Sequence, residues 1–507
     1  MSNKTIAAIA TSQSPGGIGV IRVSGSAAIF IAKTLFHPKK PLDWSALTGY
    51  RMAYGYLAEP PSPPAGPIIR EQSTTCRGEL CSPASITHPA GADTICPPSP
   101  SRDSIRTQRS DQAPPQVVDE CILLIFPAPH SYTGEHVVEF QLHGGPAILR
   151  RALNAVFAAG AQPAQPGEFT RRAYLNGRID LARAEAVMQL VSATGEQAAR
   201  AAAAAMGGAL SQRIEAIRAS LTALAAHIAA WVDYPEDDIP ALQPAELSAT
   251  LSTAIQDLQT LLRNAPRDQL MLSGVNTALL GKPNVGKSSL MNLLAGYDRS
   301  IVTNRPGTTR DTVTETVQLG NLQLRLTDTA GIHNTSDAIE AAGVARSRAA
   351  LAQADLLLLV VDASQPLTEE DHALFALCDP TRSILILNKS DLPQATLIPD
   401  SCHLSSIHIS ALTGHGLEDL TAAIESLLGT ANFSPHEAIL ANHRQSNCAA
   451  QALAALEEAL CAAQAGIPLD AISVCLEDAI QALYTLTGER AADAIVDEVF
   501  ASFCVGK

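Results

Sequence analysis

Short apolar runs with the spacing of β-strands occupy residues 5–11, 19–25, 120–126 and 136–143. Runs of this length, bounded by Gly, Pro and polar clusters, are typical of strands. The first two flank the turn Ser14-Pro15-Gly16-Gly17. We therefore expect residues 1–181 to form a mixed α/β domain.

The pattern changes to helical spacing after residue 181. Residues 182–232 are rich in Ala, with Leu, Val, Ile and Met at helical intervals, and Pro is absent until Pro235. Residues 240–263 and 437–503 show a similar pattern of apolar residues at helical intervals. This pattern predicts long helices of a bundle, in which Ala-rich faces let the helices pack closely.

Between the two helical stretches the apolar runs return to strand length, at residues 277–280, 322–326, 384–387 and 407–409. Because similar helical stretches flank this region, we interpret residues 274–431 as a complete unit inserted into one helical domain, residues 182–273 and 432–507. The predicted fold class is therefore multidomain, with α/β parts and an all-α helical bundle.

Residues 59–117 differ in composition from the strands on either side. They are rich in Pro, Ser, Thr, Arg and Gln and poor in apolar residues. Such a segment buries too little apolar surface to offset its ordering entropy, so we predict a disordered surface insertion. A zinc site built from Cys76, Cys81, Cys96 and His88 is the alternative, but their spacing is irregular.

Length and charge narrow the class of protein further. The chain has 507 residues, enough for three domains, and a net charge of −15 that opposes loose binding to nucleic acid. No apolar run approaches the roughly 20 residues of a membrane span, and the first residues resemble no export signal. The ten cysteines lack paired spacing. We expect a cytoplasmic protein that does not enter membranes.

The candidate chemistry begins at Gly281-Lys282-Pro283-Asn284-Val285-Gly286-Lys287-Ser288, which fits the pattern G-x-x-x-x-G-K-[ST]. Backbone N–H groups of such a loop surround phosphates, its Lys reaches the β- and γ-phosphates, and its Ser binds Mg²⁺. The loop lies between a predicted strand and the predicted helix 289–295. A glycine turn without a ligand is the structural alternative.

Four later segments carry residue types that a guanine-nucleotide site needs, in the expected order along the chain. They are residues 307–311, 328–331, 388–391 and 410–412. Asp328 follows a predicted strand, where it can bind Mg²⁺ through water. The Asp391 carboxylate can accept from N1–H and the exocyclic amine of guanine, which adenine does not offer in that arrangement. The predicted GTP contacts are Asn284, Val285, Gly286, Lys287, Ser288, Ser289, Thr303, Asn304, Arg305, Pro306, Gly307, Thr308, Thr309, Asp328, Thr329, Ala330, Gly331, Asn388, Lys389, Ser390, Asp391, Ser410, Ala411 and Leu412.

The residue after Gly331 bears on the mechanism. Ras-type GTPases have a Gln there that orients the attacking water, whereas this chain has Ile332, which offers neither donor nor acceptor. Asn284 and the loop of residues 303–308 could instead supply oxygens to a monovalent cation beside the phosphates. Glu340 is a candidate for positioning the water, with a solvated charge on a helix as the alternative.

Three stretches outside the GTP motifs carry a resemblance to a known family. They are Pro129-His130-Ser131-Tyr132-Thr133-Gly134-Glu135 with His143-Gly144-Gly145-Pro146, residues 166–181 (PGEFTRRAYLNGRIDL), and the terminal Cys504-Val505-Gly506-Lys507. Apart from residues 59–117, the chain resembles the MnmE (TrmE) family of bacterial tRNA modification GTPases. The resemblance implies an N-terminal folate-binding and dimerisation domain, a helical domain, and an inserted Ras-like G domain.

The resemblance also implies ligands and partners. K⁺ would be held by Asn284, Thr303, Arg305 and Thr308, and Mg²⁺ by Ser288 and Thr309; Glu340 would position the water. A 5-formyltetrahydrofolate or related folate would bind Arg22, Glu139, Arg178 and Lys507. The family forms homodimers and a heterotetramer with the FAD-dependent protein MnmG, and modifies C5 of the wobble uridine of certain tRNAs.

Two alternatives stay open at this stage. Cys504 could be a nucleophile in one-carbon chemistry or a small apolar anchor for the chain's tail. The whole protein could be a regulatory GTPase switch in ribosome assembly or signalling. That second hypothesis predicts a basic RNA-binding module after the G domain, whereas residues 437–503 are rich in Glu and Asp.

Overall fold

The computed structural model describes residues 4–12, 14–45, 47, 49–60, 116–193, 195–234, 240, 242–297, 314–328, 352, 354–399, 402–430, 433–434 and 437–506. The chain divides into two compact units. One contains Met1–Arg172 with Cys504–Lys507, and the other contains Ala173–Phe503. The second unit includes both the helical bundle and the nucleotide-binding segment.

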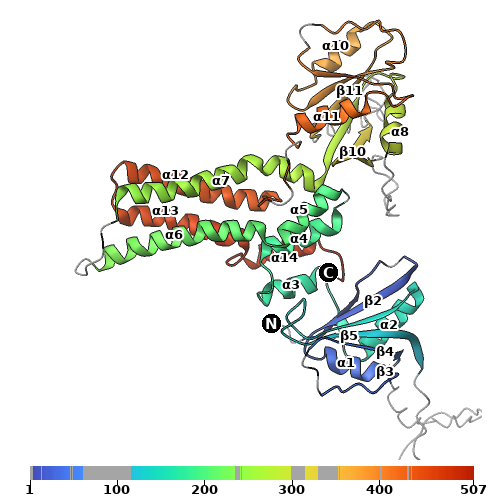
Figure 1. Ribbon diagram of the computed structural model, residues 1–507, viewed down its shortest axis with the longest axis vertical. Coiled ribbons are helices and arrows are strands. Elements are labelled where there is room, and N and C mark those ends of the chain that lie inside the picture. Colours follow the sequence, from blue (N-terminus) through green and yellow to red (C-terminus); the bar gives the residue numbers. More distant parts are fainter. Residues whose placement is uncertain are drawn as a thin grey trace, which may run out of the picture. The chain divides into compact units, whose positions relative to one another are not determined.

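The first unit is a seven-stranded sheet with two helices packed on one face (Figure 1). Its strand order is β3-β4-β5-β6-β2-β1-β7, and all neighbours are antiparallel except β1 and β7. Ile21, Leu123 and Phe140 are fully buried beneath Leu149 of α2. The elements are β1 Ile6–Ile9, β2 Gly16–Ser24, α1 Ala28–Leu35, β3 Phe36–Pro38, β4 Arg51–Ala58, β5 Val117–Phe126, β6 Val137–Gly144, α2 Pro146–Ala158 and β7 Gln162–Pro163.

The segment predicted to be an insertion joins the ends of two neighbouring strands. β4 and β5 pair antiparallel with Ala58 opposite Val117, and the Glu59 N–H donates to the Gln116 carbonyl at 3.0 Å. Val117 is thus the first residue of strand β5 rather than the last residue of the predicted insertion. The predicted end of the insertion is wrong by one residue. The predicted disorder and the zinc alternative concern residues 61–115, which lie outside the described residues.

Strand β4 is an element that the sequence pattern did not reveal. Met52 and Tyr54 are large apolar residues on the open face of the sheet, where both stay exposed. The opposite face of β4 carries Gly55, whose missing Cβ admits the His37 carbonyl of the neighbouring strand. An apolar outward face and a glycine facing inward hide the alternation that sequence reasoning relies on.

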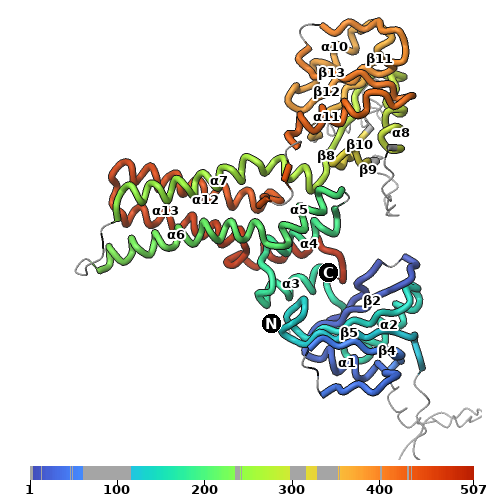
Figure 2. Tube along the Cα trace, in the orientation of Figure 1, coloured from blue at the N-terminus to red at the C-terminus, as the bar shows by residue number. Residues whose placement is uncertain are grey.

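The helical domain is built from both of its sequence segments. Its core contains Leu221 and Leu258 from the first segment together with Leu456 and Leu476 from the second. Figure 2 shows the late helices α12 and α13 lying beside the earlier α6 and α7. The helices of this domain are α4 Leu181–Ser192, α5 Glu196–Met206, α6 Ala209–Asp233, α7 Pro244–Ser273, α12 His443–Gln464, α13 Leu469–Thr487 and α14 Asp493–Ala501. The preceding helix, α3 Glu168–Leu175, begins in the first unit and ends in the second.

The helix α7 runs further than the predicted end at residue 263. It continues through Pro266 to Ser273 and leads through Gly274 directly into β8. The predicted helical stretch over residues 182–232 forms the three helices α4, α5 and α6, with breaks around Gly195 and at Gly207-Gly208. Glycine is a weak helix former, so these breaks fall where the backbone is least constrained.

The nucleotide-binding segment is a six-stranded sheet with strand order β13-β12-β11-β8-β10-β9. All neighbouring strands are parallel except β9 and β10. The carboxyl ends of the parallel strands therefore meet at one edge, where ligands bind in open α/β sheets. The elements are β8 Val275–Leu280, α8 Lys287–Tyr297, β9 Thr314–Leu319, β10 Leu322–Asp328, β11 Leu356–Asp362, α10 Glu369–Phe375, β12 Ser383–Asn388, β13 Ser405–His408 and α11 Leu417–Leu427.

Candidate functional site

The phosphate-binding loop connects the buried strand β8 to helix α8, as the sequence pattern predicts. Gly281 has a φ of 145°, and a Cβ there would lie 2.3 Å from the Val360 carbonyl oxygen of the neighbouring strand. The Lys287 ammonium donates to the carbonyls of Gly281 and Lys282, at 2.7 and 2.8 Å. These bonds hold the ammonium inside the curve of the loop, where a phosphate would bind.

Asn388, at the end of β12, links two motifs through its side-chain amide. Its Nδ2 donates to the Val285 carbonyl at 2.8 Å, and its Oδ1 accepts from the Ala411 N–H at 3.0 Å. The side chain is buried, with 2% of the residue exposed. Gly286 lies beside it with a φ of 99°, and a Cβ there would be 2.2 Å from Nδ2. The phosphate loop and the predicted base-binding loop are therefore held together by one amide.

Asp391, the predicted guanine acceptor, is oriented by a neighbouring loop. The Ser410 hydroxyl donates to Asp391 Oδ1 at 2.6 Å, and the Ser390 N–H donates to the Ile409 carbonyl at 3.1 Å. Asp391 is exposed at the sheet edge rather than buried. Its second carboxylate oxygen can face a base, and nucleotide binding would then bury the group. The Leu412 side chain is 85% exposed beside it.

Lys389 lies between these motifs with a φ of 64° and forms an ion pair. Its ammonium contacts Asp362 Oδ2 at 2.6 Å, and the other Asp362 oxygen accepts from the N–H and hydroxyl of Ser364. Burial acts to raise the pKa of the Asp362 carboxyl, but the hydrogen bonds from Lys389 and Ser364 outweigh it and lower the pKa. Asp362 was not predicted from the sequence; its position at the end of β11, in line with Asp328 and Asn388, is the signal that points to it.

Part of the predicted GTP site falls outside the described residues. The backbone of Asp328 is described: it ends β10 and lies opposite Leu279 of β8, next to the phosphate loop. The side chains of Asn284 and Ser288 are exposed on that loop. The predicted residues outside the described ranges are Thr303, Asn304, Arg305, Pro306, Gly307, Thr308, Thr309, Thr329, Ala330, Gly331, Glu340 and Lys507.

Two of the predicted folate-binding residues meet in the first unit. Arg22 Nε donates to Glu139 Oε1 at 2.7 Å, and the guanidinium lies over the rings of Tyr132 and Phe169 at 5.9 and 5.7 Å from their centroids. Arg22 also donates to the Gly506 carbonyl at 3.4 Å. The pair is partly exposed, so a ligand could reach it, and a bound carboxylate or pterin would compete with the Arg22–Glu139 contact.

Arg178 belongs to the second compact unit. It lines a pocket of about 470 Å³ that also contains Tyr174, Asp180, Arg183, Thr487 and Glu489. Within this lining, the Tyr174 hydroxyl donates to the Gly488 carbonyl at 2.5 Å.

The terminal segment packs within the first unit. Gly506 has a φ of 99°, and a Cβ there would lie 2.4 Å from the Ile9 carbonyl oxygen. The Gly167 N–H donates to the Cys504 carbonyl at 3.3 Å, while Cys504 itself is exposed. The exposed residue does not fill the core of this unit, so the anchoring contacts come from the backbone rather than from its thiol.

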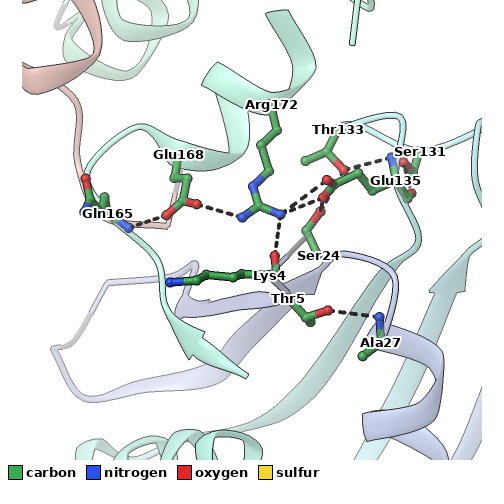
Figure 3. Close-up of polar contacts among 10 residues, drawn as sticks. All are labelled: Lys4, Thr5, Ser24, Ala27, Ser131, Thr133, Glu135, Gln165, Glu168 and Arg172. Atoms are coloured by element: carbon green, nitrogen blue, oxygen red, sulfur yellow. Dashed lines mark hydrogen bonds and ion pairs between the residues drawn. The ribbon is translucent and has the colours of Figure 1, made fainter. Parts of the chain in front are cut away.

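A polar network around Arg172 explains several residues of the stretches that carry the family resemblance (Figure 3). The guanidinium contacts Glu135 Oε2 at 3.0 Å, Glu168 Oε1 at 2.7 Å and the Lys4 carbonyl at 2.9 Å. The Ser24 hydroxyl also contacts Glu135 Oε2, at 2.8 Å. Arg172 is 9% exposed. These residues satisfy each other internally, so they stabilise the domain rather than face a ligand.

The exposed donor atoms of the phosphate loop suit the implied ions. The Ser288 hydroxyl and the Asn284 amide oxygen are exposed oxygen donors, and oxygen is the ligand that Mg²⁺ and K⁺ require. The described residues contain no group of three or more His, Cys, Asp or Glu that could hold a metal ion. The two oxygen donors on the loop are placed where a cation could also contact a bound phosphate.

Comparisons with known proteins cover the chain almost completely. The family model "MnmE helical domain" matches residues 181–504, and "GTP-binding protein TrmE N-terminus" matches residues 5–75 and 78–178, which include most of residues 59–117. The tRNA modification GTPase MnmE of Thermus thermophilus is 39% identical over 503 residues, and that of a Roseiflexus species is 37% identical over 515 residues. Both alignments cover 99% of each chain. The solved G domain of the T. maritima FeoB iron transporter is 28% identical over 30% of this chain and 98% of that chain, with a TM-score of 0.25.

Proposed function

The chain belongs to the MnmE family of tRNA modification GTPases, and we propose that it uses GTP hydrolysis to drive modification of C5 of the wobble uridine in certain tRNAs. The similarity over the whole length of the chain is the observation that carries this proposal. The arrangement of Asn388, Asp391 and Ser410 at one sheet edge supports the nucleotide part. The group added would be of the aminomethyl or carboxymethylaminomethyl type.

In the proposed GTP site, the described residues would contact different parts of the nucleotide. Lys287 would pair with the β- and γ-phosphates, and the α8 N-terminus would contribute N–H groups and its dipole. Asp391 would accept from the guanine N1–H and amine while Ser410 fixes its orientation. An ATP base would leave this carboxylate unpaired, so the pocket should reject ATP.

Hydrolysis would depend on residues of the phosphate loop and of the segments beyond it. Ser288 and Thr309 would hold Mg²⁺; Asn284, Thr303, Arg305 through its carbonyl, and Thr308 would hold K⁺. These ions offset negative charge that develops on the phosphates. Glu340 would orient the attacking water in place of the Gln that Ras-type enzymes use. We propose that two G domains come together for this step.

The first unit would bind a folate one-carbon donor, 5-formyltetrahydrofolate or a related compound. Arg22 and Glu139 are partly exposed and lie beside two aromatic rings, which suits a ligand with a flat pterin ring and carboxylates. Arg178 and Lys507 complete the proposed set. Direct titration of the full chain with 5-formyltetrahydrofolate, compared with Arg22→Gln, tests this assignment.

The proposed assembly is a homodimer that forms a heterotetramer with the FAD-dependent protein MnmG and acts on tRNA. No described helix has the length and apolar character needed to cross a membrane. Co-purification of MnmG with the full chain tests the partner assignment, and the mass of the complex in solution tests its composition.

Mass spectrometry of tRNA nucleosides tests the central proposal. A strain that lacks this gene should lose the substituent at C5 of the wobble uridine and regain it with the wild-type gene but not with Asp391→Ala. Intact modification in the deletion strain would exclude the tRNA function. Separately, GTP turnover should be faster in K⁺ than in Na⁺ at equal ionic strength; equal rates would exclude cation activation while leaving the tRNA function in place.

A further inference from the structure

We propose that Asp371 of helix α10 is a positioning residue for GTP binding, acting through Lys282 of the phosphate loop. The two side chains form an ion pair, with 2.6 Å between Lys282 Nζ and Asp371 Oδ2. The pair joins the loop to an element that follows the neighbouring strand β11 and that carries none of the predicted GTP contacts. This inference deepens the proposed GTP site and rests on it.

The pair is well shielded from water. The side chain of Asp371 is 2% exposed and that of Lys282 is 19% exposed. Asp371 Oδ2 also accepts from the N–H and hydroxyl of Thr368, at 2.8 and 2.9 Å, whereas its Oδ1 is buried with no hydrogen-bond partner in the described part of the chain. Lys282 is the cation in contact with this carboxylate, so the pair is held by charge that solvent screens weakly.

Lys282 connects this anchor to the lysine that binds phosphate. Its main-chain carbonyl accepts from Lys287 Nζ at 2.8 Å, while its own ammonium is held by Asp371 and by the Thr368 hydroxyl at 2.9 Å. A fixed Lys282 side chain restrains the backbone of the same residue, and that backbone aims the Lys287 ammonium. The line of contacts therefore runs from Asp371 through Lys282 to Lys287.

Two other contacts, from strands β12 and β11, also hold the loop. Asn388 bonds to the carbonyl of Val285, close to the start of helix α8, and Gly281 lies against the Val360 carbonyl. Between these points, Lys282 carries the side-chain bonds that tie the first half of the loop to α10. Loss of this tie would let the first half of the loop move and would weaken phosphate binding more than it changes the chemical step.

The capping of α10 does not depend on Lys282, which separates positioning from stability. Thr368 and Asp371 form a capping box, in which each side chain bonds the other's backbone N–H. Lys282→Met keeps both residues of the capping box and removes the tie to the loop, but it leaves the buried Asp371 carboxylate without its cation. Lys282→Arg keeps the charge and the reach. Lys33→Met, at an exposed position on α1, is the matched control for loss of one lysine charge.

The test is titration of the full chain with the fluorescent analogue N-methylanthraniloyl-GDP, together with GTP turnover. Lys282→Met should raise the Kd about 10- to 100-fold, the range for one lost charge-assisted hydrogen bond. Its kcat at saturating GTP should stay within about twofold. Lys282→Arg should restore affinity, and Lys33→Met should match the wild type. Asp371→Asn should weaken binding in the wild-type background and add nothing to Lys282→Met, because Asp371 acts through Lys282.

Unchanged affinity in Lys282→Met would overturn the proposal, even with a lowered Tm, because the pair would then be structural only. Additive losses in Lys282→Met with Asp371→Asn would overturn it as well. The double variant has no unpaired buried charge, so it can be measured even where Lys282→Met folds poorly. Wild-type protein that fails to bind the analogue would instead contradict the GTP site itself.

Discussion

The side-chain amide of Asn388 donates to the main-chain carbonyl of Val285 across 2.8 Å, so the end of strand β12 holds the phosphate loop directly. The same amide accepts from Ala411 through its oxygen. Its two ends are chemically different, which allows one bond to be removed while the other is kept.

Asn388→Asp should break only the bond to the phosphate loop. A carboxylate oxygen would face the Val285 carbonyl where the Nδ2 donor was, while the bond from Ala411 could remain. Two oxygens opposed in a buried place repel each other, and we expect GDP affinity to fall about 10- to 100-fold. Titration with labelled GDP measures this. Asn154→Asp, on the exposed side of α2, should leave affinity unchanged; an equal loss there would point to a general charge effect.

Gly286→Ala should abolish nucleotide binding for a steric reason. The added Cβ would lie 2.2 Å from Asn388 Nδ2, and the φ of 99° is one that residues with a Cβ rarely adopt. Gly296→Ala is the matched control, because Gly296 lies within α8 and a Cβ there meets no atom within 4 Å. The control should bind GDP normally and gain about 0.5–1 kcal/mol in helix stability. Normal binding by Gly286→Ala would show that the loop adopts another conformation.

Asp391→Asn should change which base is bound rather than whether a nucleotide is bound. A carboxylate can accept from two donors of guanine, whereas an amide presents one donor and one acceptor, which suits xanthine. We expect GTP turnover at low substrate to fall by at least about 100-fold and XTP turnover to rise. Ser410→Ala, which removes the 2.6 Å bond to Asp391 and the bond that the Ser410 hydroxyl accepts from the Thr413 N–H, should cause a smaller loss of GTP affinity. An unchanged GTP preference in Asp391→Asn would mean that Asp391 does not contact the base.

The Asp362–Lys389 pair should contribute an acid-sensitive part of the stability. The pKa of Asp362 is lowered in the folded protein, so its stabilising effect is present above the ordinary carboxyl pKa of 3.8 and is lost as the pH falls below that value. We expect the Tm to fall more steeply below pH 4 in the wild type than in Asp362→Asn. At pH 7 the variant should be less stable. Parallel Tm profiles would show that this pair does not contribute.

Glu185 and Arg444 join the two sequence segments of the helical domain and should be strongly coupled. Two guanidinium nitrogens contact the Glu185 carboxylate at 2.7 and 2.8 Å, and the Glu185 side chain is 8% exposed. Arg444→Met should destabilise the helical domain by about 3–5 kcal/mol, because it leaves a buried charge unpaired. Urea unfolding followed by helical circular dichroism measures this.

The control for that prediction is a pair of the same chemistry on the surface. Arg200 and Glu196 are 54% and 76% exposed, and Arg200→Met should cost less than about 1 kcal/mol. The double variant Glu185→Leu with Arg444→Met should recover part of the loss, because no charge remains unpaired. If the double variant were no more stable than Arg444→Met, packing rather than charge would explain the loss.

The sequence by itself determined the family, the fold class and the order of the nucleotide motifs. Gly286, Lys287 and Asp391 were predicted as site residues because phosphate and guanine recognition requires particular residue types at short spacings. Apolar periodicity likewise placed most strands of the two sheets and most of the helical bundle, since it reflects which face of each element is buried.

Only the tertiary structure decided which distant residues meet. No role was predicted from the sequence for Asp371 or Asp362. In the structure each forms an ion pair with a lysine that folding brings within 2.6 Å. Strand β4 escaped prediction because its alternation is hidden by Gly55 and by apolar residues on its open face. The sequence of a segment indicates its local conformation and which of its faces is buried. Which segments pair with each other depends on strand order, and the pattern within one segment does not indicate strand order.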